Sequence, residues 1–143
     1  MMTAPARSAN VKQVVPFFMV TDMERSLKYY VEGLGFTRKN QWIVEGKIRW
    51  CWLELGGAAL MLQEFHKERI PSGKLGDGTS IWFQCEDAIA LYREFRGRGI
   101  EASEPQVGNA QWETMLRDPD GYKVNFGSPT TVAEETRLSE VKS

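Results

Sequence analysis

The sequence predicts an α+β fold in which two βαβββ units form curved mixed sheets around a cleft. Two observations predict it: the composition of a small folded domain and a pattern that occurs twice along the chain. The 143 residues are 42% hydrophobic and 26% charged, which suits one globular domain. The formal charge of −1 gives no basic footprint for nucleic acid, and no apolar run is long enough to span a membrane.

The pattern that occurs twice is an internal repeat, whose order is kept over a large part of the chain. The aligned positions are Val15 with Ser80, Phe17 with Trp82, Asp22 with Asp87 and, after one residue drops out, Gly57 with Gly121 and Met61 with Asn125. Strand-like, helix-like and glycine-containing segments recur in the same order. Duplication of one unit therefore explains the pattern better than a chance similarity of two unrelated strand–helix units.

The first unit is expected at residues 13–64. Its residues 13–20 are rich in β-branched and aromatic side chains, which predicts a strand. Thr21, followed three residues later by Glu24, predicts a capping box that opens a helix over residues 23–33. Glycines end this helix, and the three strands expected after it lie at residues 36–44, 48–55 and 58–64.

The second unit is expected at residues 79–128, after a polar loop. A strand and a helix come first, and a DPDG turn separates the last two of the following strands; the ranges are 79–85, 86–97, 100–107, 111–117 and 122–127. The domain then comprises residues 11–128. Residues 1–10 are expected to be flexible, and the polar tail at 129–143 to be frayed or a short helix.

Strand alternation assigns side chains to the two faces of each sheet. The helix-facing set is expected to contain Phe18, Val20, Phe83, Cys85, Val124 and Phe126. The concave set is expected to contain Val15, Phe17, Met19, Ser80, Trp82, Gln84, Lys123 and Asn125. Trp50 and Trp52 share a face with Glu54, but alternation alone leaves open whether that face is the concave one.

The opening segment VVPFFMVTDMERSLKYYVEGLGF and the closing segment LRDPDGYKVNF resemble the vicinal oxygen chelate superfamily. This superfamily includes glyoxalase I, bleomycin resistance proteins and extradiol dioxygenases, and the resemblance covers residues 13–128. Within it, TSIWFQCEDAIALYREF and QWETMLRDPDGYKVNF look most like the bleomycin resistance proteins. The resemblance implies a homodimer with two clefts shared between subunits, each cleft holding a small molecule.

In the superfamily's enzymes four inward-facing side chains hold one divalent metal ion. The resemblance places those four positions at Val15, Met61, Ser80 and Asn125. Valine cannot coordinate a metal, methionine suits soft copper and neutral serine is a poor ligand, so Asn125 alone fits. Shifting the Met61 assignment to Gln63 adds a second amide but no charge, which is too little for a divalent cation. We therefore expect no metal and no other cofactor.

No set of residues for covalent or acid–base catalysis stands out. The single histidine, His66, is expected to be a solvent-facing loop residue, which with Glu64 could chelate a metal only adventitiously. Glu54 or Glu64 could act as a lone general base in an apolar cleft that raised its pKa. No catalytic residue is therefore assigned.

Five tryptophans are many for a chain of this length. If Trp50 and Trp52 face inward, they join Trp82 and Trp112 in a flat-walled aromatic cleft, and the resemblance places Trp112 in that cleft near the subunit boundary. Such a wall suits planar, heteroaromatic or cationic ligands. The polar anchors expected beside it are Glu54, Gln63, Ser80 and Asn125. The alternative is that the tryptophans pack the core or a dimer interface.

Three functions remain open. A metal-independent protein that sequesters an aromatic or cationic small molecule explains both the missing metal ligands and the tryptophans. A lyase, isomerase or dioxygenase with displaced ligands or a single acid–base residue is the second, and a non-catalytic interaction subunit with a vestigial cleft is the third. Cys51 and Cys85 lie in strand-like segments, and the opening residues show no signal-peptide pattern, so a cytoplasmic location without disulfides is expected.

Overall fold

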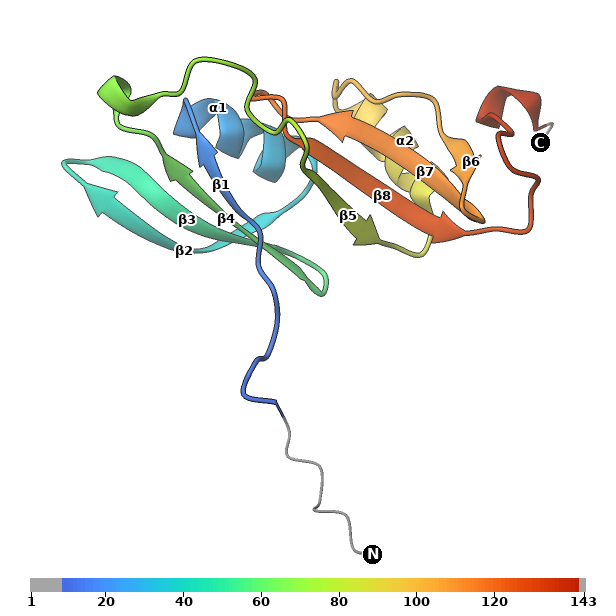
Figure 1. Cartoon of the computed structure of the whole chain (residues 1–143), viewed down its shortest axis with the longest axis horizontal. Coiled ribbons are helices and arrows are strands. Elements are labelled where there is room, and N and C mark those ends of the chain that lie inside the picture. The colour runs from blue at the N-terminus through green and yellow to red at the C-terminus, as the bar shows by residue number, and fades with distance from the viewer. Residues whose placement is uncertain (1–8, 142–143) are drawn as a thin grey trace, which may run out of the picture.

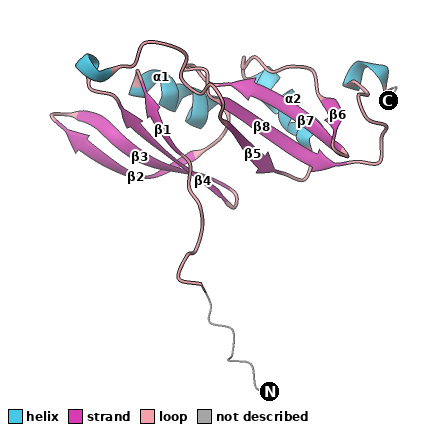
Figure 2. Ribbon diagram, viewed as in Figure 1, coloured by secondary structure: helices cyan, strands magenta, loops and turns pink. Residues whose placement is uncertain are grey.

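The computed structural model describes residues 9–141 and contains two four-stranded sheets, each with one main helix (Figure 1). The first sheet has the order β1-β4-β3-β2, from β1 Phe17–Val20, β2 Thr37–Val44, β3 Lys47–Leu55 and β4 Ala58–Glu64. The second has the order β5-β8-β7-β6, from β5 Ser80–Gln84, β6 Gln106–Gly108, β7 Gln111–Arg117 and β8 Lys123–Pro129. The expected α+β class with two βαβββ units is confirmed (Figure 2).

The two sheets share one topology and one register. In each, the first strand of the unit lies parallel to the last, and the other pairs are antiparallel. Phe17 lies opposite Met61 in the first sheet, and Trp82 lies opposite Asn125 in the second. These are positions that the sequence repeat aligns, so the repeat describes equivalent places in the two units.

Each unit places its helix after its first strand. α1 at Met23–Leu27 continues as a π-helical stretch over Lys28–Gly33, and together they span the helix predicted from the sequence. α2 covers Ala88–Gly97. Asp22 and Asp87, which the repeat aligns, cap the two helices by accepting a backbone N–H bond in the first turn, at 3.1 and 2.9 Å.

Two predicted strands are shorter in the structure. The strand expected at 100–107 is limited to Gln106–Gly108, because Pro105 has no N–H to donate and Ser103 makes an isolated backbone bond to Met115 at 3.2 Å. The strand expected from residue 13 begins at Phe17.

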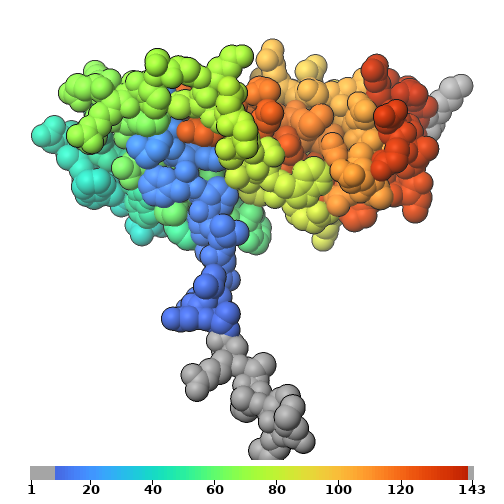
Figure 3. All heavy atoms as spheres, in the orientation of Figure 1, coloured from blue at the N-terminus to red at the C-terminus, as the bar shows by residue number. Residues whose placement is uncertain are grey.

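The tail beyond residue 128 contains the short helix that was one of the two expectations. β8 runs on to Pro129, and a single 3₁₀ turn forms at Leu138–Glu140. Glu104 accepts both the Ser139 backbone N–H and its hydroxyl, at 2.9 and 2.6 Å. In Figure 3 this last segment, in red, lies against the orange part of the second unit.

The core lies between the sheets and the helices, as strand alternation predicted. A chain of aromatic contacts runs through it, and in one of them the ring centroids of Phe83 and Phe126 are 5.0 Å apart. Phe18 and Val20 are buried and Cys85 is half-buried. None of the helices in residues 9–141 is long and apolar enough to cross a membrane.

The DPDG turn of the second unit holds the start of α1 in the first unit. Asp120 accepts the backbone N–H of Thr21 at 3.0 Å and its hydroxyl at 2.5 Å, and it pairs with Arg25 at 3.0 Å. Buried Asp118 accepts the Tyr30 hydroxyl at 2.7 Å and two backbone N–H groups of its own turn. The Thr21 capping prediction was therefore wrong, because this hydroxyl is used between the units.

Candidate functional site

The third strand of the first unit shows which face its tryptophans share. Cys51 and Leu53 are fully buried under α1, so Trp50, Trp52 and Glu54 lie on the opposite, concave face. Two rows of side chains cross this face from β1 to β2. One row is Phe17, Met61, Trp52 and Asn40, and the other is Met19, Gln63, Trp50 and Trp42.

The Trp52 indole is fixed by a hydrogen bond. Its Nε1–H donates to the Glu54 carboxylate at 2.8 Å, two residues along the same face. Glu54 therefore fixes the orientation of this indole through one of its two carboxylate oxygens. Gln63 lies on β4 directly opposite Trp50. From there its amide can hydrogen-bond to a ligand that lies on the neighbouring row, which contains Trp52.

The concave face of the second unit is built in the same way. Three rows cross it from β5 to β7: Ser80, Lys123 and Arg117; Trp82, Asn125 and Met115; and Gln84, Gly127 and Glu113. The predicted residues Ser80, Trp82 and Asn125 are thus brought together on this sheet. Trp50, Trp52, Glu54 and Gln63 are brought together on the other.

Trp82 is held flat against the strands although 42% of its surface is exposed. Its Nε1–H donates to Gln84 at 3.0 Å, and Gln84 in turn donates to Gln111 at 2.9 Å. The ring lies over Gly127: a Cβ at that position would stand 1.8 Å from the indole. Gly127 is thus the residue that lets the indole lie on the sheet, and its strand position alone gave no sign of this role.

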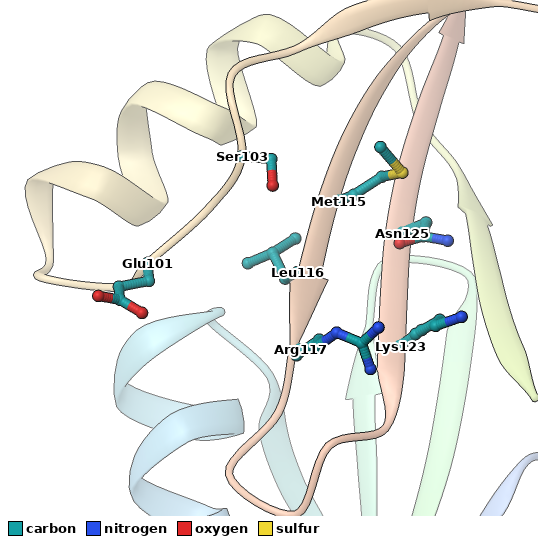
Figure 4. Close-up of a pocket in the computed structure, with 7 residues that line it drawn as sticks. All are labelled: Glu101, Ser103, Met115, Leu116, Arg117, Lys123 and Asn125. Carbon is teal, nitrogen blue, oxygen red and sulfur yellow. The ribbon is translucent and has the colours of Figure 1, made fainter. Parts of the chain in front are cut away.

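A hollow of about 470 Å³ lies beside β7 and β8 of this sheet. Its lining includes Met115, Arg117, Lys123 and Asn125, and Glu101 and Ser103 close it from the segment before β6. Figure 4 shows Arg117 and Lys123 extending to the same side of neighbouring strands. Sequence analysis had placed Lys123 on this face but had given neither cation a role.

Trp112 does not belong to either concave face. It is 7% exposed and packs with Ala88 and Val107 in a small core cluster on the α2 side of the second sheet. Its neighbours Thr114 and Leu116 on the same face of β7 are also buried. The expectation that Trp112 lines the cleft is corrected, because β7 alternation turns it toward the helix.

The four positions at which the superfamily's enzymes hold a metal do not fit a divalent cation here. Val15 and Met61 belong to the first unit and offer a hydrocarbon and a thioether, while Ser80 and Asn125 offer neutral oxygens. Lys123, directly opposite Ser80, adds a positive charge. Within residues 9–141, no group of three or more His, Cys, Asp or Glu side chains gathers to hold an ion.

The pair Glu64 and His66 is already engaged. Glu64 accepts the Met23 backbone N–H at 2.8 Å and pairs with Arg49 at 3.3 Å, on the helix side of the first sheet. The other arm of the Arg49 guanidinium lies 3.2 Å from His66 Nδ1. Glu64 therefore holds α1 to β4, and no acid–base pair forms at this end.

Burial affects one carboxyl group of the second face. Glu113 lies in the row of Gly127, at the far end of the face from Arg117 and Lys123. Partial burial, together with the nearby carboxylate of Glu134, raises the pKa of Glu113. The second face is thus cationic at one end and carries a carboxyl group at the other.

The family model described as "Glyoxalase/Bleomycin resistance protein/Dioxygenase superfamily" matches residues 11–126. The chain belongs to this superfamily. The resemblance seen in its opening and closing segments is therefore confirmed. The comparison with curated proteins found no match.

Solved structures of the superfamily share the fold at low sequence identity. A glyoxylase/bleomycin resistance protein/dioxygenase domain from Frankia sp. EAN1pec has a TM-score of 0.69 at 15% identity, covering 87% of this chain and 96% of that one. The antibiotic binding protein TnmS3 from Streptomyces sp. CB03234 has a TM-score of 0.66 at 21% identity, covering 86% and 100%. The bleomycin-binding protein of Streptomyces verticillus, complexed with copper(II)-bleomycin, has a TM-score of 0.65 at 21% identity, covering 85% and 98%.

Proposed function

We propose that this superfamily member is a metal-independent binding protein that sequesters an aromatic or cationic small molecule in a tryptophan-lined cleft. The observation that carries the proposal is the pair of indoles fixed on the two concave faces. Trp52 is held by Glu54 and Trp82 by Gln84, through Nε1–H bonds of 2.8 and 3.0 Å. A ring held in this way binds a flat ligand without losing much side-chain freedom.

Two of the structural relatives support binding as the function. One is described as an antibiotic binding protein, and another is described in complex with bleomycin. Both bind a small molecule with the fold that this chain shares. The proposal extends ligand binding, and not the identity of either ligand, to this chain.

The donor set supports metal independence. Two of the four superfamily positions, Val15 and Met61, cannot offer an oxygen or nitrogen, and the cations Arg117 and Lys123 flank the other two on the second sheet. Both candidate bases of the enzyme alternative also make structural contacts, because Glu54 accepts the Trp52 indole N–H and Glu64 accepts the Met23 backbone N–H at the start of α1.

We also propose a homodimer in which each cleft is shared between subunits. Large apolar side chains are exposed on the concave faces: Phe17 at 46%, Trp42 at 57%, Trp82 at 42% and Met115 at 39%. A face with this much exposed apolar surface is typical of a binding site or an interface. Sedimentation of the full chain tests this part separately, and a monomer at micromolar concentration would contradict it.

The binding test uses N-phenylnaphthylamine, an uncharged aromatic probe whose fluorescence rises on binding. Trp82→Ala and Trp52→Ala should each weaken probe binding by about threefold to tenfold, the worth of one aromatic contact. Tyr92→Ala, on the outer helix α2, is the matched control and should leave binding unchanged. Equal affinity in all variants would overturn the cleft assignment.

Elemental analysis tests the metal statement. Protein purified without an affinity tag should hold less than about a tenth of an equivalent of any transition metal, also after soaking in zinc, nickel, manganese and iron. Near one equivalent of one metal would refute metal independence and support the enzyme alternative.

A further inference from the structure

The concave face of the second unit carries two neighbouring cations with no acidic partner. Arg117 and Lys123 lie directly opposite each other on β7 and β8. Like charges in this cross-strand arrangement destabilise a sheet. The three ion pairs among residues 9–141 are Arg25 with Asp120, Arg49 with Glu64 and Arg98 with Glu94, so neither cation of this face is neutralised by a side chain within 4.0 Å.

The surroundings of the two cations are those of a binding surface. They line the hollow of about 470 Å³ together with Asn125 and Met115, and Lys123 has the Ser80 hydroxyl directly opposite on β5. Arg117 makes a single long bond of 3.4 Å to the Gly121 carbonyl, which leaves most of its donors free. The guanidinium, the ammonium, the Asn125 amide and the Ser103 hydroxyl that line this hollow are groups that bind a carboxylate or sulfonate, and Glu101 is the one acidic side chain in its lining.

The same face has a direction. Trp82 and Asn125 occupy the next row, roughly 7 Å along the strands from the cations. The Trp82 indole leans away from the cations, over Gly127, and Glu113 stands beyond it at the far end. A ligand with an acidic group is therefore attracted at one end of the face, stacks in the middle and is disfavoured at the other end.

We infer that the ligand of this protein is an elongated aromatic acid, whose acidic group lies between Arg117 and Lys123 while its ring system stacks on Trp82. The inference rests on the proposed binding function and narrows its ligand class from aromatic or cationic to aromatic and anionic. It also assigns the orientation of the ligand. The acidic group lies in the row of Arg117 and Lys123, and the rings extend along the strands toward Gly127.

The test compares two probes that differ by one charge. Anilinonaphthalene sulfonate carries the aromatic system of N-phenylnaphthylamine plus a sulfonate. The double variant Arg117→Gln with Lys123→Gln should weaken the affinity for the sulfonate probe by at least about tenfold. It should change the affinity for the uncharged probe by less than about twofold. Because both side chains lie on the open face of the sheet, the fold should persist, which circular dichroism verifies.

The matched control removes the same two charges elsewhere. Arg93→Gln with Arg96→Gln, on the exposed side of α2, should leave the affinity for both probes unchanged. If the control lowers the affinity for the sulfonate probe as much as the double variant does, the change in net charge explains the effect. That result would overturn the inference. Tighter binding of the cationic dye thioflavin T than of the sulfonate probe would also overturn it.

Failure of the inference is distinguishable from failure of the proposed function. Suppose that Trp82→Ala lowers the affinity for both probes and the Arg117 and Lys123 double variant lowers neither affinity. The cleft then binds aromatic molecules without recognising an anion. If Trp82→Ala alone leaves the affinity for both probes unchanged, stacking on Trp82 is refuted, and if Trp52→Ala also leaves it unchanged, the aromatic cleft itself is refuted.

Discussion

Tyr30→Phe tests the contact that joins the two units. It removes one hydroxyl, which donates to buried Asp118 at 2.7 Å, and leaves the ring in the core. Asp118 is 5% exposed and keeps its two backbone donors, so the loss is that of one bond to a charged, buried acceptor. We expect a decrease in the free energy of unfolding of about 2 kcal/mol.

The loss should correspond to a decrease in melting temperature of roughly 4–8 °C for a domain of this size. Urea unfolding followed by circular dichroism measures it. Tyr92→Phe is the matched control, because the Tyr92 hydroxyl makes no hydrogen bond to another of residues 9–141, and it should stay within about 0.5 kcal/mol of the parent. A change below about 0.5 kcal/mol for Tyr30→Phe would refute the reasoning.

The pH dependence of this variant has a defined sign. Burial raises the pKa of Asp118, and the Tyr30 hydroxyl opposes that rise by binding the carboxylate form. A raised pKa in the folded state means that the neutral acid is favoured, so the contribution of Asp118 to stability is present at low pH and falls as the pH rises through that pKa. Without the hydroxyl the pKa rises further. The cost of Tyr30→Phe should therefore be smaller at pH 4 than at pH 7.

Three further predictions follow from single contacts. Gly127→Ala should displace the Trp82 indole and weaken the binding of N-phenylnaphthylamine, because a Cβ there would stand 1.8 Å from the ring; unchanged affinity would show that the ring position is unimportant. Trp112→Ala should cost about 3–5 kcal/mol in urea unfolding, as expected of a core residue, and a cost below about 1 kcal/mol would contradict its burial. Ser139 lowers the pKa of Glu104, so the contribution of Glu104 to docking of the C-terminal turn is present above the ordinary value of 4.5 and is lost as the pH falls through the lowered folded-state pKa. Amide protection factors at residues 137–140, corrected for intrinsic exchange, should then decrease in the parent over that range and stay constant in Glu104→Gln; equal behaviour of the two proteins would contradict the assignment.

Most of the fold was predictable because its signals are local and occur twice. Alternation in the strands, an Asp before each helix and glycines at the turns recur in both units, and each occurrence supports the other. The errors fell where a tertiary contact decided the outcome. Thr21 looks like a helix cap, but its hydroxyl is used by Asp120, almost a hundred residues away in the chain.

The site was predictable only in part. Alternation placed Trp82, Ser80 and Asn125 on one face correctly, because strands β5 and β8 are regular. It could not choose between the two faces of β3, since both carry large residues, and the buried Cys51 and Leu53 decided that question in the structure. Nor could it show that Arg117 lies opposite Lys123, because this pairing depends on the register of β7 and β8.

The two units share one strand topology but carry different side chains on their concave faces. Where the first unit has Ala59 and Met61 on its last strand, the second has Lys123 and Asn125 at the equivalent places. A metal site needs donors from both units and a negative or neutral surrounding, and here the first unit lacks donors while the second adds cations. The side chains that disfavour a metal ion are the same ones that would hold an anionic group, so the proposed metal independence and the inferred acid-binding face depend on one set of residues.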